Sequence, residues 1–84
     1  MPQFMDYHEK LPDMPPEAAA QAKAMLEAGE RNEFGSKGIN VFFGTEGQAF
    51  CLSDSPDVES VIKSHEAMGI PIDAENIVEA NPLV

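Results

Sequence analysis

The stretch from Ala49 to Pro71, AFCLSDSPDVESVIKSHEAMGIP, restricts the fold of this 84-residue chain more than any other segment. It predicts a strand over 48–53, a tight turn, and a helix over about 56–68. Ser55 is a favourable N-cap for that helix. Pro56 suits the first helical position, because the N–H group that proline lacks has no partner there.

This predicted helix has one apolar face, and that face includes a histidine. Its members follow one another at the spacing of one side of a 3.6-residue helix, and they are Val58, Val61, Ile62, His65 and Met68. His65 therefore stands where an aliphatic residue is expected. Gly69 is predicted to end the helix in the left-handed conformation.

The predicted elements alternate as strand, helix, strand, strand, helix, strand. They are a strand within 2–10, a helix from Pro16 to about Asn32, strands at 39–43 and 48–53, the helix at 56–68, and a strand within 75–80. This order is the βαββαβ arrangement of ferredoxin-like α+β folds, in which a four-stranded antiparallel sheet carries two helices on one face. We expect one domain over 1–84, with 81–84 as a tail.

The charge of the chain argues against two classes of partner. Fifteen acidic and five basic side chains give a formal net charge of -10, which repels nucleic acid and anionic membrane surfaces. No stretch approaches the roughly 18 apolar residues of a membrane span. The single cysteine cannot form an internal disulfide, and the amino terminus does not resemble a signal peptide. We therefore expect a cytoplasmic protein.

Small and aromatic residues indicate how the sheet is covered. A stripe of small residues between Ala18 and Gly29 permits close packing of the first helix on the sheet. Three phenylalanines, Phe42, Phe43 and Phe50, provide more aromatic area than one layer of helices uses. We therefore expect a homodimer through the open face of the sheet.

The chain resembles a known family along nearly its whole length. The matching residues are the opening FMDYH at 4–8, FCL at 50–52, SP at 55–56, His65, the Gly69-Ile70-Pro71 exit and the strand at 77–78. In these residues it is similar to small ferredoxin-like proteins described as a domain of unknown function, some of which are named nickel-binding proteins. The resemblance implies the fold, a dimer and a transition-metal site. Many relatives carry a histidine on the first helix where this chain has Lys23.

The resemblance makes His8, Cys51 and His65 candidate ligands for nickel or another divalent transition metal. Asp6 and Glu66 are further candidate oxygen donors. Imidazole, thiolate and carboxylate groups all bind nickel, zinc or copper, and geometry decides among these metals. The chain has no CxxC or HExxH motif, and its two histidines are far apart in the sequence. A metal site in this chain would therefore depend on the fold.

Strand alternation argues against a single site. Cys51 and its neighbour Phe50 point to opposite faces of their strand. If Phe50 meets the helices, Cys51 lies on the dimer side of the sheet, where Asp6 and His8 can join it. We then expect the sheet to separate Cys51 from His65. With the opposite register, in which Cys51 faces the helices, we expect that His8, Cys51 and His65 still do not form a single site.

Each candidate ligand also has a purely structural interpretation. Cys51 can serve as a small apolar residue of a strand, and His65 as a buried neutral imidazole bonded to the backbone. His8 can be an exposed residue at a strand end.

Three functions fit these observations. The first is a non-enzymatic homodimer that binds nickel or another divalent transition metal through His8, Cys51, His65 and Asp6. The second is a small-molecule-binding or cofactor-free enzymatic dimer, in which the cavity between helices and sheet holds the ligand and His65 acts as general acid or base. The third is a structural or regulatory dimer without a ligand.

Overall fold

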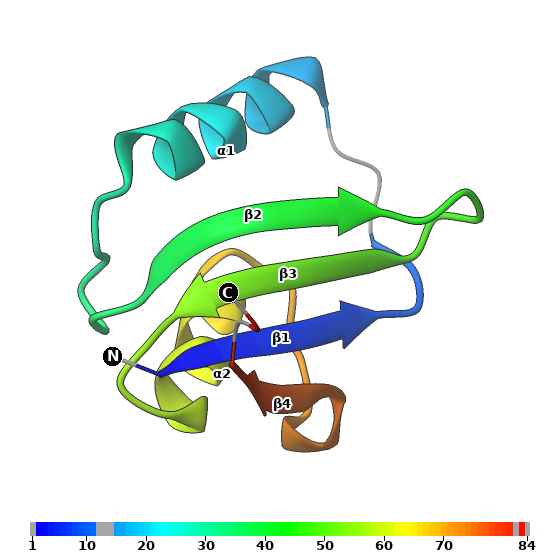
Figure 1. Cartoon of the computed structure of the whole chain (residues 1–84). Helices are drawn as coiled ribbons and strands as arrows, with labels where there is room; N and C mark the ends of the chain where they lie inside the picture. Colours follow the sequence, from blue (N-terminus) through cyan, green and yellow to red (C-terminus); the bar gives the residue numbers. More distant parts are fainter. Residues whose placement is uncertain (1, 12–14, 82, 84) are drawn as a thin grey trace.

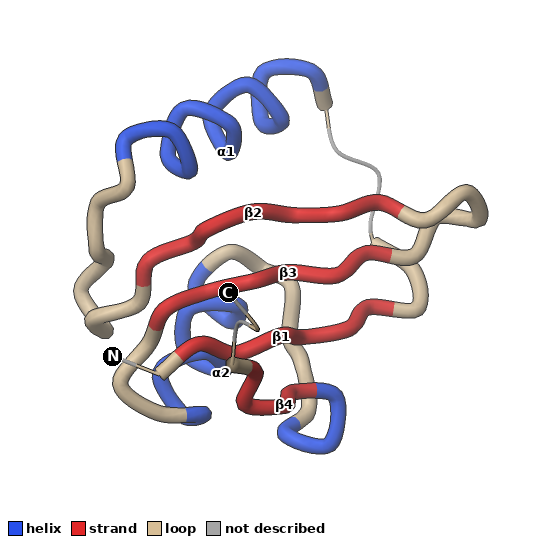
Figure 2. Tube along the Cα trace, viewed as in Figure 1, coloured by secondary structure: helices blue, strands red, loops and turns tan. Residues whose placement is uncertain are grey.

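A computed structural model describes residues 2–11, 15–81 and 83 of the chain. Its elements are β1 (Gln3–His8), α1 (Pro16–Ala28), β2 (Lys37–Phe43), β3 (Ala49–Asp54), α2 (Val58–Ala67), the 3-10 helix η1 (Ala74–Asn76) and β4 (Ile77–Ala80). The strands form one antiparallel sheet in the order β2-β3-β1-β4 (Figures 1 and 2). The predicted ferredoxin-like α+β fold is confirmed. Residues 82 and 84 of the predicted tail lie outside the described residues.

Helix α2 begins two residues later than predicted. Its N-cap is Asp57, whose carboxylate accepts hydrogen bonds of 2.8 Å from the backbone N–H and the hydroxyl of Ser60. These bonds hold the pKa of the Asp57 carboxyl below its usual value. Ser55, the predicted N-cap, is buried, and its hydroxyl donates to that of Ser36 instead. Gly69 has φ 77°, which confirms the predicted left-handed end.

Helix α1 is shorter than predicted, and it packs loosely on the sheet. It ends at Gly29, which adopts the left-handed conformation with φ 64°. None of its residues is buried, and Met25 is 65% exposed. Leu26 of α1 does approach the sheet at Gly38, where an added Cβ would lie 2.7 Å from Leu26 Cδ2. The close packing that the small-residue stripe permits is therefore not formed along most of α1.

Two polar side chains hold the loop between α1 and β2. Asn32 accepts hydrogen bonds from two backbone N–H groups of this loop, and its amide donates to the Ser64 hydroxyl of α2 at 2.8 Å. Arg31 donates to the Asp54 carboxylate at the end of β3, also at 2.8 Å. These contacts tie the loop that follows α1 to β3 and α2.

A small apolar core lies between α2 and the sheet. Its buried members are Phe4 of β1, Val61 of α2 and Ile77 of β4. The burial pattern of β1 alternates, so that Phe4 and the residues two and four positions later all face α2. In Figure 1, α2 lies behind the sheet and α1 runs along its β2 edge.

The face of the sheet away from the helices carries large apolar side chains. Tyr7 and Phe42 both lie opposite Phe50 on neighbouring strands. The ring centroids of Tyr7 and Phe50 are 5.1 Å apart, and Phe42 is 51% exposed. A second row beside them consists of Met5, Leu52 and Val78. We call these six residues the open-face patch; Phe50 belongs to it and does not meet the helices.

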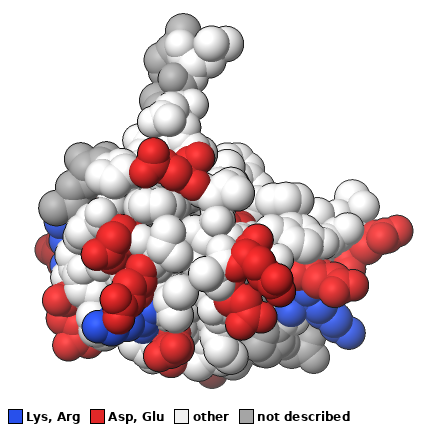
Figure 3. Space-filling view, turned by 90° about the horizontal axis from the view of Figure 1, so that it is seen from below, with Lys and Arg blue, Asp and Glu red and all other residues white. Residues whose placement is uncertain are grey.

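The surface is strongly acidic. Asp and Glu side chains are spread over the face seen in Figure 3, with Lys and Arg at only a few places. Within the part of the chain that the structure describes, no helix has the length and apolar character needed to cross a membrane.

Candidate metal centre

Four candidate ligands meet on the helix side of the sheet. Asp6 and His8 come from β1, Cys51 from β3 and His65 from α2, and one donor atom from each lies within 4.8 Å of the other three. We call these four residues the donor cluster. The expectation that the sheet separates Cys51 from His65 is therefore wrong.

The register of the central strands brings the donors together. Asp6 lies opposite Cys51 in the antiparallel β1·β3 pair, so both side chains leave the same face. His8 shares that face because side chains alternate along a strand. His65 follows the buried Val61 by one helical turn and so points at the sheet. In the structure Phe50 faces away from the helices, which is the opposite of the register considered from the sequence. This register turns Asp6, His8 and Cys51 toward α2 together.

Asp6 lies at the centre of the donor cluster and is 0% exposed. Its Oδ1 is 2.7 Å from His8 Nε2 and 3.3 Å from His65 Nε2. These distances are short, but the directions are not those of hydrogen bonds. Among the described residues, neither Asp6 oxygen nor His8 Nε2 has a hydrogen-bond partner. A buried carboxylate without donors carries a large desolvation cost, which a bound cation would offset.

The backbone of α2 orients His65. Its Nδ1 is 2.8 Å from the carbonyl oxygen of Val61. A carbonyl only accepts, so Nδ1 carries a proton and Nε2 faces the donor cluster. In metal-binding histidines, a hydrogen bond from the ring nitrogen that does not bind the metal sets the tautomer in this way. Burial by itself lowers the pKa of His65, but the Asp6 carboxylate and the Val61 carbonyl outweigh it, so that the pKa is raised overall.

The surroundings of Cys51 keep its thiol protonated. Burial, with the nearby negative charge of Asp6 acting in the same direction, raises the pKa of Cys51 to about 12. A nucleophilic cysteine needs a lowered pKa, so this position disfavours covalent catalysis. A divalent cation would have the opposite effect, because a coordinating thiol loses its proton.

The size and chemistry of the donor cluster fit one transition-metal ion. Donors bound at about 2.0–2.3 Å in a tetrahedron lie about 3.3–3.7 Å apart, so donors that now lie within 4.8 Å of one another would close on an ion by shifts of about 1 Å. Two imidazoles and a thiol favour zinc, nickel or copper over magnesium or calcium.

Some sequence candidates lie outside the cluster. Glu66 is exposed on α2, and Lys23 is an exposed residue whose amino group is 3.9 Å from the Glu27 carboxylate. His8 is only 7% exposed, so its interpretation as an exposed strand end is wrong. Sequence reasoning missed Ser53, whose position two residues after Cys51 places it on the same face of β3.

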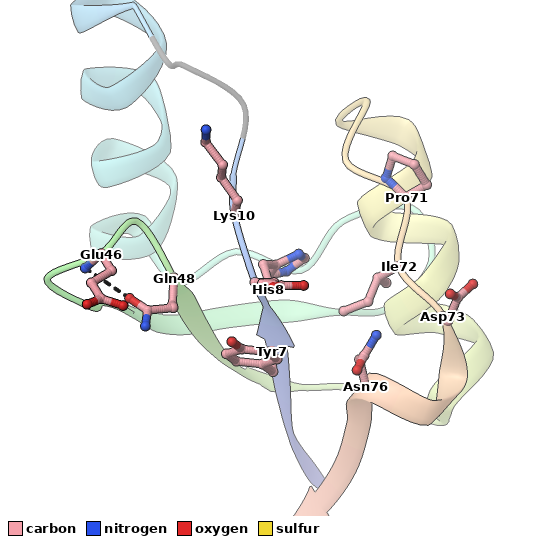
Figure 4. Close-up of a pocket in the computed structure, with 10 residues that line it drawn as sticks. Tyr7, His8, Lys10, Glu46, Gln48, Pro71, Ile72, Asp73 and Asn76 are labelled. Carbon is pink, nitrogen blue, oxygen red and sulfur yellow. Dashed lines mark hydrogen bonds between the residues drawn. The ribbon is translucent and has the colours of Figure 1, made fainter.

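Two hollows adjoin the donor cluster from different sides. A cavity of about 180 Å³ between α1, α2 and the sheet is lined by Asp6, Cys51 and His65. A groove of about 680 Å³ at the end of β1 is lined by His8. In Figure 4 the His8 side chain lies between the hairpin that carries Gln48 and the segment that carries Ile72.

Comparison with known proteins identifies a structural relative. No protein-family model and no curated protein matches this chain. The crystal structure of SCO4226 from Streptomyces coelicolor A3(2) matches with a TM-score of 0.69 and 26% sequence identity. The two chains share one fold. The match covers 98% of this chain and 99% of SCO4226, so the likeness extends over the whole domain.

Proposed function

We propose that this protein binds one divalent transition-metal ion per chain through Asp6, His8, Cys51 and His65, without catalysing a reaction. The observation that carries the proposal is the Asp6 carboxylate, which is fully buried and has no hydrogen-bond donor among the described residues. Nickel is the metal that the resemblance to nickel-binding proteins favours.

Each residue has a distinct role in the proposed site. His65 offers Nε2 from a ring already fixed by the Val61 carbonyl. Cys51 supplies the sulfur donor, and Asp6 supplies negative charge between the two imidazoles. A bound ion would supply the positive charge that neutralises Asp6 and the Cys51 thiolate.

Titration of tag-free, metal-free protein with nickel and with zinc in a calorimeter tests this proposal. We expect one ion per chain with a Kd tighter than about 100 μM. At pH 7.5, binding should release a proton from Cys51, because the pKa of this thiol is about 12. Buffers of different ionisation enthalpy measure that release.

Two variants test whether nickel binds at the donor cluster. Cys51→Ala should remove both the proton release and the near-ultraviolet absorption of a thiolate–nickel bond. Glu66→Gln removes a carboxylate next to His65 in the sequence but outside the cluster, so it should bind nickel like the parent protein. Failure to bind either metal below about 100 μM would refute the proposal.

A cofactor-free enzyme that uses His65 as general acid or base has less support. His65 Nε2 lies 3.3 Å from Asp6 Oδ1, within the donor cluster. The neighbouring Cys51 has a raised pKa, and it therefore lacks the thiolate that nucleophilic catalysis needs.

We also propose that the protein forms a homodimer through the open-face patch. Exposed, adjacent aromatic side chains on an uncovered sheet face support this arrangement, since monomers rarely expose such patches. Light scattering at micromolar concentration should give twice the chain mass of 9.1 kDa. Phe50→Glu, which places a charge in the middle of the patch, should reduce the mass to that of one chain.

Phe43→Glu is the matched control for the dimer. Phe43 is 70% exposed but lies opposite Ala49, outside the open-face patch. This variant should remain dimeric. A parent protein of single-chain mass would contradict the proposed dimer.

A further inference from the structure

The loose packing of α1 leaves a cavity directly beside the donor cluster. Its apolar wall includes Ala22 and Leu26 of α1 and Val41 of β2, and Cys51 and His65 also line it. Its volume is about 180 Å³. An apolar cavity of about 150 Å³ accommodates benzene, so one aromatic ring fits here.

Two exposed methionines, one from α1 and one from the end of α2, line this cavity. Met25 of α1 is 65% exposed and Met68 at the end of α2 is 57% exposed. Methionine side chains are flexible and polarisable, so they adapt to aromatic molecules of different shape. A ligand can therefore enter without displacing the core residues Phe4, Val61 and Ile77.

The cavity wall also holds polar groups without partners. The hydroxyl of Ser53 is buried and has no hydrogen-bond partner among the described residues. The Asp6 carboxylate also lines the cavity, on the side of the proposed metal site. Buried polar atoms are normally paired, so an apolar pocket with these groups on its wall is built for a ligand that carries polar atoms.

We propose that this cavity binds a small aromatic molecule with a Lewis-basic nitrogen and a polar hydrogen, as in an aryl-substituted imidazole. The ring occupies the apolar part, the basic nitrogen completes the coordination of the metal, and the N–H group donates to Ser53. The nitrogen contact rests on the proposed metal function, whereas the apolar contacts do not depend on it.

Calorimetry with 4-phenylimidazole and imidazole, on zinc-loaded and metal-free protein, tests this inference. We expect zinc-loaded protein to bind 4-phenylimidazole at least about 10-fold more tightly than imidazole, because burial of the phenyl ring adds apolar contact. Metal-free protein should bind 4-phenylimidazole at least about 10-fold more weakly than zinc-loaded protein does, because it lacks the bond to the basic nitrogen.

Three variants test the apolar contacts and the hydrogen bond of the proposed ligand separately. Ala22→Leu fills the cavity and should weaken 4-phenylimidazole binding at least about 10-fold while zinc affinity is unchanged. Ala20→Leu adds the same volume to α1 outside the cavity and should change neither affinity. Ser53→Ala should weaken 4-phenylimidazole binding about 3- to 10-fold through the lost hydrogen bond.

The outcomes distinguish this inference from the metal proposal. Equal affinity for the two probes, or equal binding by the Ala22→Leu and Ala20→Leu variants, would overturn the cavity ligand even if zinc binds. Absence of both nickel and zinc binding, together with 4-phenylimidazole binding that Ala22→Leu removes, would support the cavity and refute the metal centre.

Discussion

Asp6→Asn should reduce nickel affinity at least about 100-fold, because the loss of a direct charged ligand exceeds the effect of losing an outer-shell partner. At pH 8, the same substitution should raise the unfolding free energy of the metal-free protein by about 1 kcal/mol. Asparagine removes a buried, unpaired charge, and its amide can donate to the imidazole nitrogens. Calorimetry with nickel and urea unfolding in the presence of a chelator measure the two effects.

The stability gain from Asp6→Asn should shrink as pH falls. The pKa of His65 is raised in the folded protein, partly by Asp6. Pairing of protonated His65 with Asp6 therefore stabilises the parent protein fully below the unfolded pKa of about 6.5, and this contribution is lost as pH rises through the folded value. The Asp6→Asn variant lacks this stabilising pairing at low pH. A drop in stability at pH 8 with unchanged nickel affinity would contradict the assigned role of Asp6.

Phe4→Ala should destabilise the protein by about 3–5 kcal/mol, because it opens a cavity where β1 packs on α2. Phe4 is 3% exposed, and the core cluster has few other buried members to compensate. A domain of this size commonly has a total stability of about 3–5 kcal/mol. We therefore expect the variant to be largely unfolded at 25 °C by circular dichroism.

Phe43→Ala provides the control for Phe4→Ala. Phe43 is 70% exposed, so its truncation should change the unfolding free energy by less than about 0.5 kcal/mol. A loss below about 1 kcal/mol for Phe4→Ala would show that the contact of β1 with α2 does not hold the fold together.

Much of the fold follows from local sequence signals. Gly69 ends α2 as predicted because its positive φ is a local property of the chain. The start of α2 was misplaced because Ser55 and Asp57 are both good caps, and the contact between Ser55 and Ser36, distant in the sequence, decides between them. The packing of α1 could not be predicted, since small residues permit close contact with the sheet but do not enforce it.

The sequence by itself determined the order of the elements, the two faces of each strand, and the direction of His65 along the apolar stripe of α2. It did not determine which face of the sheet α2 covers, since both faces of β3 carry residues that can be buried. Only the tertiary structure decided this. The small residues Ala49 and Cys51 lie on the helix side of β3, and the large Phe50 lies on the open face. That packing choice turns Cys51 toward His65 and assembles the donor cluster around Asp6.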